Sequence, residues 1–307
     1  MPTNDNTSNS SCFLKKGDCV EIVACAKFVS KNDIDDAIKY IKEKGYRISL
    51  NSSIFNREHV FAGTVSQRLE VLQLALDNPK TKAIFFARGG YGTIQLLDFI
   101  NFTQFHKNPK WLIGFSDITI LLTHVQIIYG IKSIHAPMLY NFSMVHISVI
   151  DSLFGLLEGK YKQINIASYS LNKLGFTQGK VIGGNLSILY SLLGSKSFSI
   201  GKNEYILFIE DVDEYLYHVE RMIYSLDHAQ ILKNIKGLIV GQMTNMLDNE
   251  IPFGKDVNTI IYDVVKKYDY PICFNFPVGH VRENYPLIIG AKVELLVKKD
   301  KSSLRYI

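Results

Sequence analysis

The chain of 307 residues is long enough for one large domain or two ordinary ones, and its 47% hydrophobic and 21% charged residues are typical of a soluble globular protein. The 34 basic residues only slightly outnumber the 29 acidic ones and are spread along the chain, which argues against a nucleic-acid-binding surface. No apolar run is long enough to span a membrane, and the polar residues 1–12, which we expect to form a disordered tail, lack the apolar segment of a signal peptide. These features predict a cytoplasmic protein with no membrane and no nucleic-acid partner.

The first half of the chain alternates between segments typical of buried strands and segments with apolar residues at helical spacing. The predicted strands are residues 18–26, 46–52, 82–87 and 110–115, and the predicted helices are residues 31–45, 64–79, 91–100 and 117–130. This alternation predicts a parallel sheet covered by helices, in an α/β domain over residues 1–160. Ligands in such sheets bind at the carboxyl ends of the strands, where the segments "ARGGYG" and "GFSD" fall.

Beyond residue 160 this alternation weakens. Residues 161–184 mix polar residues and glycines without helical spacing, and we interpret residues 161–178 as a linker. The predicted strands that follow are residues 205–211, 235–243, 271–279 and 291–297, and the predicted helices are residues 185–194, 215–232 and 257–268. They predict a second α/β domain over residues 179–307, with more strand near its end.

Ser116 stands at the junction between a predicted strand and a predicted helix, in the sequence Gly-Phe-Ser-Asp. A tight turn there projects the hydroxyl at the helix N-terminus, where free backbone N–H groups favour developing negative charge, as in a nucleophile elbow. The N–H of Asp117 would then form half of an oxyanion hole. The match is partial because Ile118 stands where the hydrolase elbow has glycine, so a simple helix cap by Ser116 or Asp117 is the alternative interpretation.

The glycine-rich segment "ARGGYG", residues 87–92, ends the preceding predicted strand. Its adjacent glycines, Gly89 and Gly90, let the backbone approach a ligand and present N–H groups to an anion, although a turn that simply needs glycine fits equally well. The segment is neither a Walker loop nor a dinucleotide-binding motif. Arg88 can bind a carboxylate through two hydrogen bonds, or it can be a structural partner of an acid such as Asp117.

Glu210 and Asp211 end another predicted strand, and His280 lies in a loop behind a further one. A strand-end carboxylate can hold an imidazole in the tautomer that a nucleophilic serine needs. The acids can instead be charges at a helix N-terminus, and a single loop histidine is usually a surface residue. Ser116, Glu210 and His280 nevertheless follow predicted strands in the order serine, acid, histidine, which a triad gathered at one sheet edge requires.

The cysteines and histidines show no pattern of a disulfide framework or a metal site. The four cysteines, Cys12, Cys19, Cys25 and Cys273, include no CxxC pair and fit a reducing compartment. We interpret Cys25 as a small buried residue near a strand end rather than as a nucleophile. The eight histidines form no HxxxH or HExxH pattern, so we expect no metal, and nothing implies an organic cofactor.

Taken together, these motifs resemble those of the LD-carboxypeptidase family of serine peptidases, which includes the muropeptide LD-carboxypeptidases and the microcin C self-immunity peptidases. The resemblance runs in order along nearly the whole chain, through "GDCVEIVA", "FAGTVSQRLEVLQLAL", "FFARGGYG", "GFSDITILL", "HAPM", "GGNLSIL", "FIEDVDEYLYHVERMI", "GLIVGQM" and "PVGHVRENYPLIIGAKVEL". Two departures are "VACAKFVS", where many members have a Pro-Ser pair, and Ile288 in place of a proline. Both concern loop shape near the site more than the chemistry.

The resemblance implies a fold and a reaction. The fold is an N-terminal Rossmann-like domain with a parallel sheet and a C-terminal α/β domain with barrel-like strands. The reaction is removal of the terminal D-alanine from a muropeptide tetrapeptide in peptidoglycan recycling, by a homodimer that needs no cofactor. Ser116 falls on the nucleophile of the family's triad, Glu210 on the acid and His280 on the general base.

Two further expectations concern how the substrate is held. We expect the Asp117 N–H and one N–H from Gly89 or Gly90 to form the oxyanion hole. Because a carboxypeptidase must recognise a free chain end, we expect Arg88, or the N–H groups that follow it, to help bind the substrate carboxylate.

Two alternative functions remain open at this point. A microcin-type immunity peptidase that cleaves a peptidyl or aminoacyl nucleotide conjugate needs an aromatic platform for the base, and the only tryptophan, Trp111, is expected to be buried. A non-catalytic protein could instead bind an anionic ligand through "ARGGYG", in which case Ser116 would be dispensable.

Overall fold

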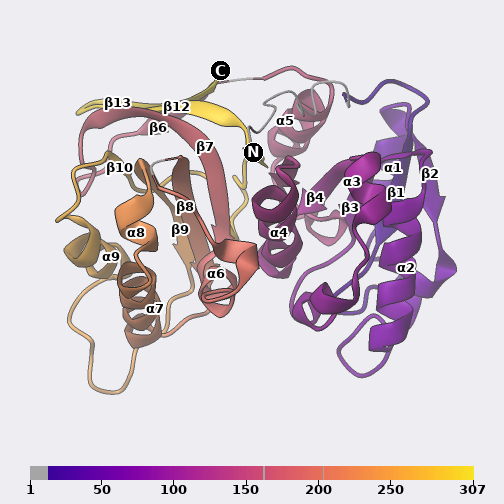
Figure 1. The fold of residues 1–307 in the computed structure, drawn as a ribbon, viewed down its shortest axis with the longest axis horizontal. Helices are drawn as coiled ribbons and strands as arrows, with labels where there is room; N and C mark the ends of the chain where they lie inside the picture. The colour runs from indigo at the N-terminus through magenta and orange to yellow at the C-terminus, as the bar shows by residue number, and fades with distance from the viewer. Residues whose placement is uncertain (1–12, 162, 203) are drawn as a thin grey trace. The chain divides into compact units, whose positions relative to one another are not determined.

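The computed structural model describes residues 13–161, 163–202 and 204–307. The chain divides into two compact units, Met1–Lys160 with Pro286–Ile288, and Tyr161–Tyr285 with Ile289–Ile307 (Figure 1). The tail expected over residues 1–12, which includes Cys12, lies outside the described residues. Each unit is built on one sheet.

The first unit is built on a six-stranded sheet with the strand order β11-β5-β4-β3-β1-β2. Its strands are β1 (Cys19–Val23), β2 (Arg47–Leu50), β3 (Thr81–Phe86), β4 (Trp111–Gly114), β5 (Ser133–His135) and β11 (Leu287–Ile289). β1 pairs in parallel with β2 and β3, and parallel pairing continues from β3 to β4 and from β4 to β5. The predicted parallel α/β sheet is therefore confirmed, and the loops that follow β3 and β4 leave the same edge of it.

Two helices of the first unit, α2 and α4, show a recognisable sequence signal at one end. The helices of this unit are α1 (Asp35–Glu43), α2 (Val65–Asp77), α3 (Thr103–Lys107), α4 (Thr119–Tyr129) and α5 (Ile147–Leu157). Helix α2 starts with a capping box, in which the side chains of Thr64 and Gln67 each accept a hydrogen bond from the other's N–H. Helix α4 ends at Gly130, whose φ of +67° lies in the left-handed region that favours glycine.

The helix predicted over residues 91–100 is wrong, because this segment forms two short 3₁₀ turns, Thr93–Gln95 and Leu97–Phe99. Arg68 of α2 donates hydrogen bonds to the Gly92 carbonyl oxygen and to the Gln95 side chain. These tertiary contacts hold the segment in a conformation that helical propensity does not favour. Strands β5 and β11 and helices α3 and α5 were not predicted.

The second unit is built on a seven-stranded sheet with the order β10-β9-β8-β7-β12-β13-β6. Its strands are β6 (Ile164–Ala167), β7 (Gly175–Asn185), β8 (Tyr205–Val212), β9 (Gly237–Thr244), β10 (Ile272–Cys273), β12 (Lys292–Val297) and β13 (Lys301–Tyr306), and its helices are α6 (Leu186–Ser191), α7 (Leu216–His228), α8 (Ile231–Asn234) and α9 (Val257–Val265). Strands β7 to β10 are parallel, whereas β12 pairs antiparallel with β7 and β13, and β13 with β6. The second α/β unit thus has a mixed sheet, with its antiparallel strands at one side (Figure 1).

Two segments of the second unit differ from their predicted form. Residues 161–178, expected to be a linker, include β6 and the beginning of β7. The exposed half of β7 is rich in polar residues and glycine, which hides its strand character. The strand predicted over residues 271–279 shortens to Ile272–Cys273, because Asn275 adopts a left-handed φ of +57° and turns the chain out of the sheet.

Within the ranges that the structure describes, no helix combines the length and the apolar content needed to cross a membrane.

Candidate active site

Ser116 occupies a strained turn between strand β4 and helix α4. Phe115 is still extended, with φ −153° and ψ −171°, but Ser116 has a φ of +59° and opens the 3₁₀ turn Ser116–Ile118 that leads into α4. A positive φ at a residue other than glycine costs about 1–3 kcal/mol and persists only where the surroundings impose it. The residue at the N-cap of α4 is Ile118, with no side-chain cap. The turn therefore favours a nucleophile elbow over a simple helix cap.

The glycine loop, residues 87–92, lies beside this serine within the first unit. A Cβ placed on Gly89 would lie 3.4 Å from Ser116 Cβ and 3.6 Å from Ser116 Oγ. Gly90 has a φ of +113°, and a Cβ there would lie 2.5 Å from Cδ of Lys27. The backbone at Gly89 therefore lies beside the serine hydroxyl, and the missing side chain at Gly90 leaves room for Lys27.

The carboxylate of Asp117 points away from solvent and binds the segment that follows the glycine loop. The residue is 1% exposed, and its Oδ2 accepts hydrogen bonds from the Thr93 N–H at 2.9 Å and from the Thr93 hydroxyl at 2.6 Å. Burial raises the pKa of this carboxyl above its usual value, while the two Thr93 hydrogen bonds and the charge of Arg68 act in the opposite direction. Asp117 therefore has a structural side chain beside the backbone N–H expected in the oxyanion hole.

Arg88 is half-buried next to the glycine loop and does not take Asp117 as its hydrogen-bonding partner. Its Nη1 donates to the Phe28 carbonyl oxygen at 3.1 Å, and its guanidinium lies 4.2 Å from the centre of the Tyr140 ring. This contact orients the planar guanidinium on an aromatic face. The alternative interpretation of Arg88 as the ion-pair partner of Asp117 receives no support, since the Asp117 carboxylate is bound by Thr93.

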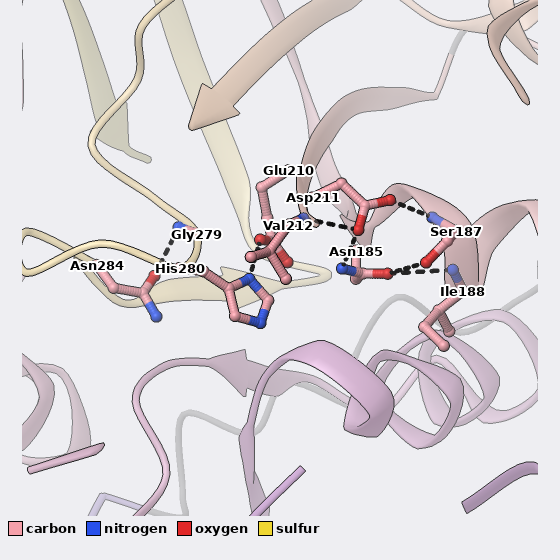
Figure 2. A network of polar contacts seen from close by, with 9 residues as sticks. All are labelled: Asn185, Ser187, Ile188, Glu210, Asp211, Val212, Gly279, His280 and Asn284. Atoms are coloured by element: carbon pink, nitrogen blue, oxygen red, sulfur yellow. Dashed lines mark hydrogen bonds and ion pairs between the residues drawn. The ribbon is translucent and has the colours of Figure 1, made fainter. Parts of the chain in front are cut away.

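Glu210 and His280 form a hydrogen-bonded pair in the second unit, in which Glu210 is buried and His280 is partly exposed (Figure 2). Glu210 lies on β8 with no exposed surface, and its Oε2 is 2.8 Å from Nδ1 of His280. The pairing of β8 with β9 shifts register between Ile209 and Asp211, at the position of Glu210. Such irregularities re-aim a side chain out of the regular alternation of a strand.

The loop that carries His280 is fitted closely around Glu210. Gly279 has a φ of +124°, and a Cβ there would lie 3.0 Å from Glu210 Oε2, so only glycine fits. The Gly279 N–H donates to Asn284 Oδ1 at 2.9 Å, and Asn284 is 1% exposed (Figure 2). These contacts fix the backbone from which the imidazole projects.

The electrostatics of the pair prepare His280 to take up a proton. Burial alone lowers the pKa of His280, but the charge and the hydrogen bond of Glu210 outweigh it and raise that pKa above its ordinary value. A carboxylate at Nδ1 assigns the ring proton to that nitrogen and leaves the lone pair on Nε2. This is the tautomer that a general base for a serine hydroxyl requires.

Asp211, next to Glu210, anchors the start of helix α6 (Figure 2). Its carboxylate accepts hydrogen bonds from Asn185 Nδ2 at 2.8 Å, the Ser187 N–H at 2.8 Å and the Val212 N–H at 2.9 Å. Burial, together with the neighbouring Glu210 charge, raises the pKa of Asp211 to about 7. Asp211 is therefore a packing and electrostatic neighbour of the pair, a role that the sequence did not separate from that of Glu210.

The structure gives no support for a nucleophilic Cys25, a base-stacking Trp111 or a metal site. Cys25 is fully buried, and burial raises the pKa of its thiol, which disfavours the reactive thiolate. Trp111 is 1% exposed and belongs to the core of the first unit. In the part of the chain that the structure describes, no three His, Cys, Asp or Glu side chains cluster as metal ligands.

Sequence reasoning missed Arg68, Thr93, Asn185 and Asn284, which hold these loops. A signal for Arg68 was present: the buried residues of α2 recur at helical spacing and include this arginine among apolar side chains. A charged residue on an otherwise apolar helix face indicates a buried polar network. The other three give no comparable signal: the carboxylates that Thr93 and Asn185 bind lie 24 and 26 residues away, and Asn284 meets Gly279 only through the turn of their shared loop.

Comparison with known proteins gives a consistent result over both units. The model of the LD-carboxypeptidase N-terminal domain matches residues 20–136, and that of the LD-carboxypeptidase C-terminal domain matches residues 178–295. A probable murein peptide carboxypeptidase of Bacillus subtilis is 30% identical over 292 residues, which cover 92% of this chain and 90% of that protein. The structure of muramoyltetrapeptide carboxypeptidase from Oxalobacter formigenes superimposes with a TM-score of 0.85 at 26% identity, covering 94% of this chain and 98% of that one. The microcin C7 self-immunity protein MccF of Escherichia coli is 24% identical over 305 residues, covering 89% of this chain and 88% of that protein.

Proposed function

This chain belongs to the LD-carboxypeptidase family, and from that membership we propose that it removes the terminal D-alanine from muropeptide tetrapeptides in peptidoglycan recycling. Family and relatives make it a carboxypeptidase, a hydrolase that acts on peptide bonds. The observation that carries the proposed chemistry is the contact of 2.8 Å between Oε2 of the buried Glu210 and Nδ1 of His280. A buried carboxylate paired with an imidazole is the acid–base half of a serine hydrolase triad.

In the proposed mechanism Ser116, His280 and Glu210 act as a unit. Ser116 Oγ attacks the carbonyl carbon that precedes D-alanine, while His280 Nε2 accepts the hydroxyl proton. Collapse of the tetrahedral intermediate breaks the C–N bond, and His280 gives that proton to the departing amine. Water, deprotonated by His280, then hydrolyses the acyl-enzyme and regenerates Ser116. Glu210 holds the imidazole in the required tautomer and stabilises its charged form.

The negative charge that develops on the carbonyl oxygen is held by backbone donors in this proposal. We assign the Asp117 N–H and one N–H from Gly89 or Gly90 to the oxyanion hole. The closeness of Gly89 to Ser116 Oγ supports the assignment of the glycine loop. Each such donor contributes about 3 kcal/mol to stabilisation of the transition state.

A free carboxylate marks the chain end that a carboxypeptidase must recognise. We assign Arg88, or the N–H groups that follow it, to the substrate carboxylate. One Arg88 nitrogen is engaged by the Phe28 carbonyl oxygen, and stacking on Tyr140 fixes the plane of the guanidinium. A guanidinium has five N–H donors, so this arrangement leaves donor capacity for a ligand.

Location and assembly follow from the proposed substrate and the family. Muropeptide tetrapeptides recovered during recycling are processed inside the cell, so we propose a cytoplasmic enzyme. We further propose that it acts as a homodimer, with no nucleic-acid and no membrane partner.

A microcin-type self-immunity peptidase is the second candidate, supported by the likeness to MccF of Escherichia coli. Cleavage of a nucleotide conjugate needs an aromatic side chain that stacks on the base. Trp111, the only tryptophan of the chain, is 1% exposed and is not available for stacking. Exposed tyrosines such as Tyr91, which is 51% exposed, can still stack on a base, so assay of the two substrates decides between the functions.

The test is to incubate the purified protein with a muropeptide tetrapeptide and to measure released D-alanine by mass spectrometry. The proposal expects release by the wild type and almost none by Ser116→Ala. A peptidyl nucleotide conjugate is assayed in parallel, and its faster cleavage would favour the microcin-type function. If Ser116→Ala retains full function, a non-catalytic anion-binding protein becomes the better description.

A further inference from the structure

The peptide bond between Gly92 and Thr93, at the end of the glycine loop, is held from both sides by buried side chains. Its carbonyl oxygen accepts a hydrogen bond from Arg68 Nη1 at 3.0 Å. Its N–H donates to Asp117 Oδ2 at 2.9 Å, and the Thr93 hydroxyl donates to the same oxygen at 2.6 Å. Because Asp117 directly follows Ser116, this peptide links the glycine loop to the nucleophile turn.

The other N–H donors of Arg68 bind three further segments of the first unit near the Gly92–Thr93 peptide. The side chain is 1% exposed, and it donates to the Cys25 carbonyl oxygen at 2.8 Å and to the Gly63 carbonyl oxygen at 3.2 Å. Its Nη2 donates to Gln95 Oε1 at 2.7 Å. A buried guanidinium is tolerated only where its donors are satisfied in this way. Arg68 thus ties the segment after β1, the start of α2 and the glycine loop together.

Gly92 is the position at which this arrangement leaves no room for a side chain. It has a φ of +130°, and a Cβ there would lie 2.7 Å from Arg68 Nη1. The glycine is therefore required by the approach of the arginine as well as by the backbone conformation. The glycine loop and the Arg68 guanidinium therefore pack directly against each other at Gly92.

We infer that Arg68, Thr93 and the carboxylate of Asp117 clamp the Gly92–Thr93 peptide and so hold the glycine loop at the distance from Ser116 that the oxyanion requires. The inference rests on the proposed function and gives Asp117 a second role beside that of its N–H. None of the three side chains needs to touch substrate, so they are positioning residues. A misplacement of about 1 Å in such a site can lower the rate by about 100-fold.

The clamp is tested by variants that loosen it without removing a proposed catalytic group. Thr93→Val removes the hydroxyl but keeps the N–H, and Thr93→Ser restores a hydroxyl. Asp117→Asn keeps the backbone N–H and weakens the acceptor. For Thr93→Val and Asp117→Asn we expect kcat to fall about 10- to 100-fold with KM changed less than about threefold, and Thr93→Ser to stay near the wild type.

A second readout does not depend on knowing the peptide substrate. Diisopropyl fluorophosphate phosphorylates an activated serine: Oγ attacks phosphorus, the P–F bond breaks, fluoride leaves and the serine proton is lost to the general base. The phosphoryl oxygen uses the same donors as a peptide oxyanion. The rate at which Ser116 is labelled, measured by intact-protein mass spectrometry, should fall in the loosened variants in step with kcat.

Matched controls separate positioning from general destabilisation. Thr123→Val removes another buried threonine hydroxyl, which donates to the Thr119 carbonyl oxygen at 2.7 Å within α4. Arg68→Met is a further loosened variant, which removes the guanidinium of the clamp and should also slow labelling of Ser116. Its control is Lys110→Met, which removes a cation that is 1% exposed and donates to carbonyl oxygens at the end of α2. The controls should lower the melting temperature but keep the labelling rate.

The outcomes distinguish failure of the inference from failure of the proposed function. If the wild type neither releases D-alanine nor is labelled at Ser116, the proposed function fails. If the wild type is labelled and folded Thr93→Val and Asp117→Asn are labelled at the same rate, the clamp is overturned. It is also overturned if Thr123→Val or Lys110→Met loses labelling to the same extent.

Discussion

Replacing Gly89 by alanine tests the proposed oxyanion hole with a single methyl group. The φ of Gly89 is not in the left-handed region, so alanine fits the backbone. The new Cβ would lie 2.9 Å from Met138 Cε and 3.6 Å from Ser116 Oγ. The methionine contact is the end of a flexible side chain and can move, whereas the methyl remains beside the serine hydroxyl.

The structure predicts a small effect on stability and a large effect on activity. Alanine in place of glycine stabilises by about 0.4–1 kcal/mol through the unfolded chain, and displacement of the methionine methyl opposes this by about 1 kcal/mol or more. The free energy of unfolding should thus change by less than about 2 kcal/mol. If the methyl blocks the approach of the oxyanion to one donor, the loss is about 2.7–4 kcal/mol, or 10²- to 10³-fold in kcat.

The assay measures kcat and KM for D-alanine release, together with urea unfolding of each protein. Gly155→Ala is the control, because a Cβ at this position in α5 meets only the Lys160 backbone at 3.5 Å and Lys160 Cβ at 4.0 Å. It should leave kcat unchanged. A Gly89→Ala protein that is folded and fully active would refute the assignment of this part of the glycine loop to the oxyanion hole.

Four further predictions concern the proposed catalytic and binding groups. Ser116→Ala and His280→Ala should each lower kcat by about 10⁴-fold or more, and the double variant little further; multiplied losses would contradict a triad. Because Glu210 raises the pKa of His280, wild-type kcat/KM should fall as pH drops through a value above that of an ordinary histidine. Glu210→Gln should move that acid limb to lower pH, and an unmoved limb would contradict the pairing. EDTA should leave activity unchanged, whereas loss on chelation that zinc restores would indicate a metal enzyme. Arg88→Lys should lose efficiency on the free acid and much less on an amidated substrate, and equal losses would assign Arg88 to the scaffold.

The sequence predicted best those parts of the fold that local periodicity determines. Strands β1 and β4 and helices α1, α2, α4 and α9 fall within their predicted ranges, and strands β3, β8 and β9 extend only one residue beyond theirs. Strand β11 could not be predicted in this way, because its three residues pair with β5, far away in the sequence. A short strand of this kind is fixed by its partner and not by its own pattern.

The sequence allowed candidate catalytic residues to be proposed, but it did not reveal the residues that hold their loops in place. Ser116, Glu210 and His280 were predicted as site residues because strand ends, glycines and titratable residues can be read locally, and the family resemblance then combined them. The partner of Asp117 could not be read, since Thr93 lies 24 residues away. Asn284 binds Gly279 within one loop, but only the three-dimensional turn brings the amide to the N–H.

Backbone irregularity coincides with the proposed chemistry, but it does not identify chemistry by itself. Six non-glycine residues among those described have a positive φ, namely His59, Ser116, Asp213, Gln230, Asn245 and Asn275. Of these six, only Ser116 lies between a buried parallel strand, β4, and a 3₁₀ turn that continues directly into a helix, α4. Its strain is held by a buried neighbour, Asp117, whose carboxylate is bound to another loop. A turn that needed only to change direction would use glycine, as at Gly130, so a strained serine with such support argues that the hydroxyl itself is required.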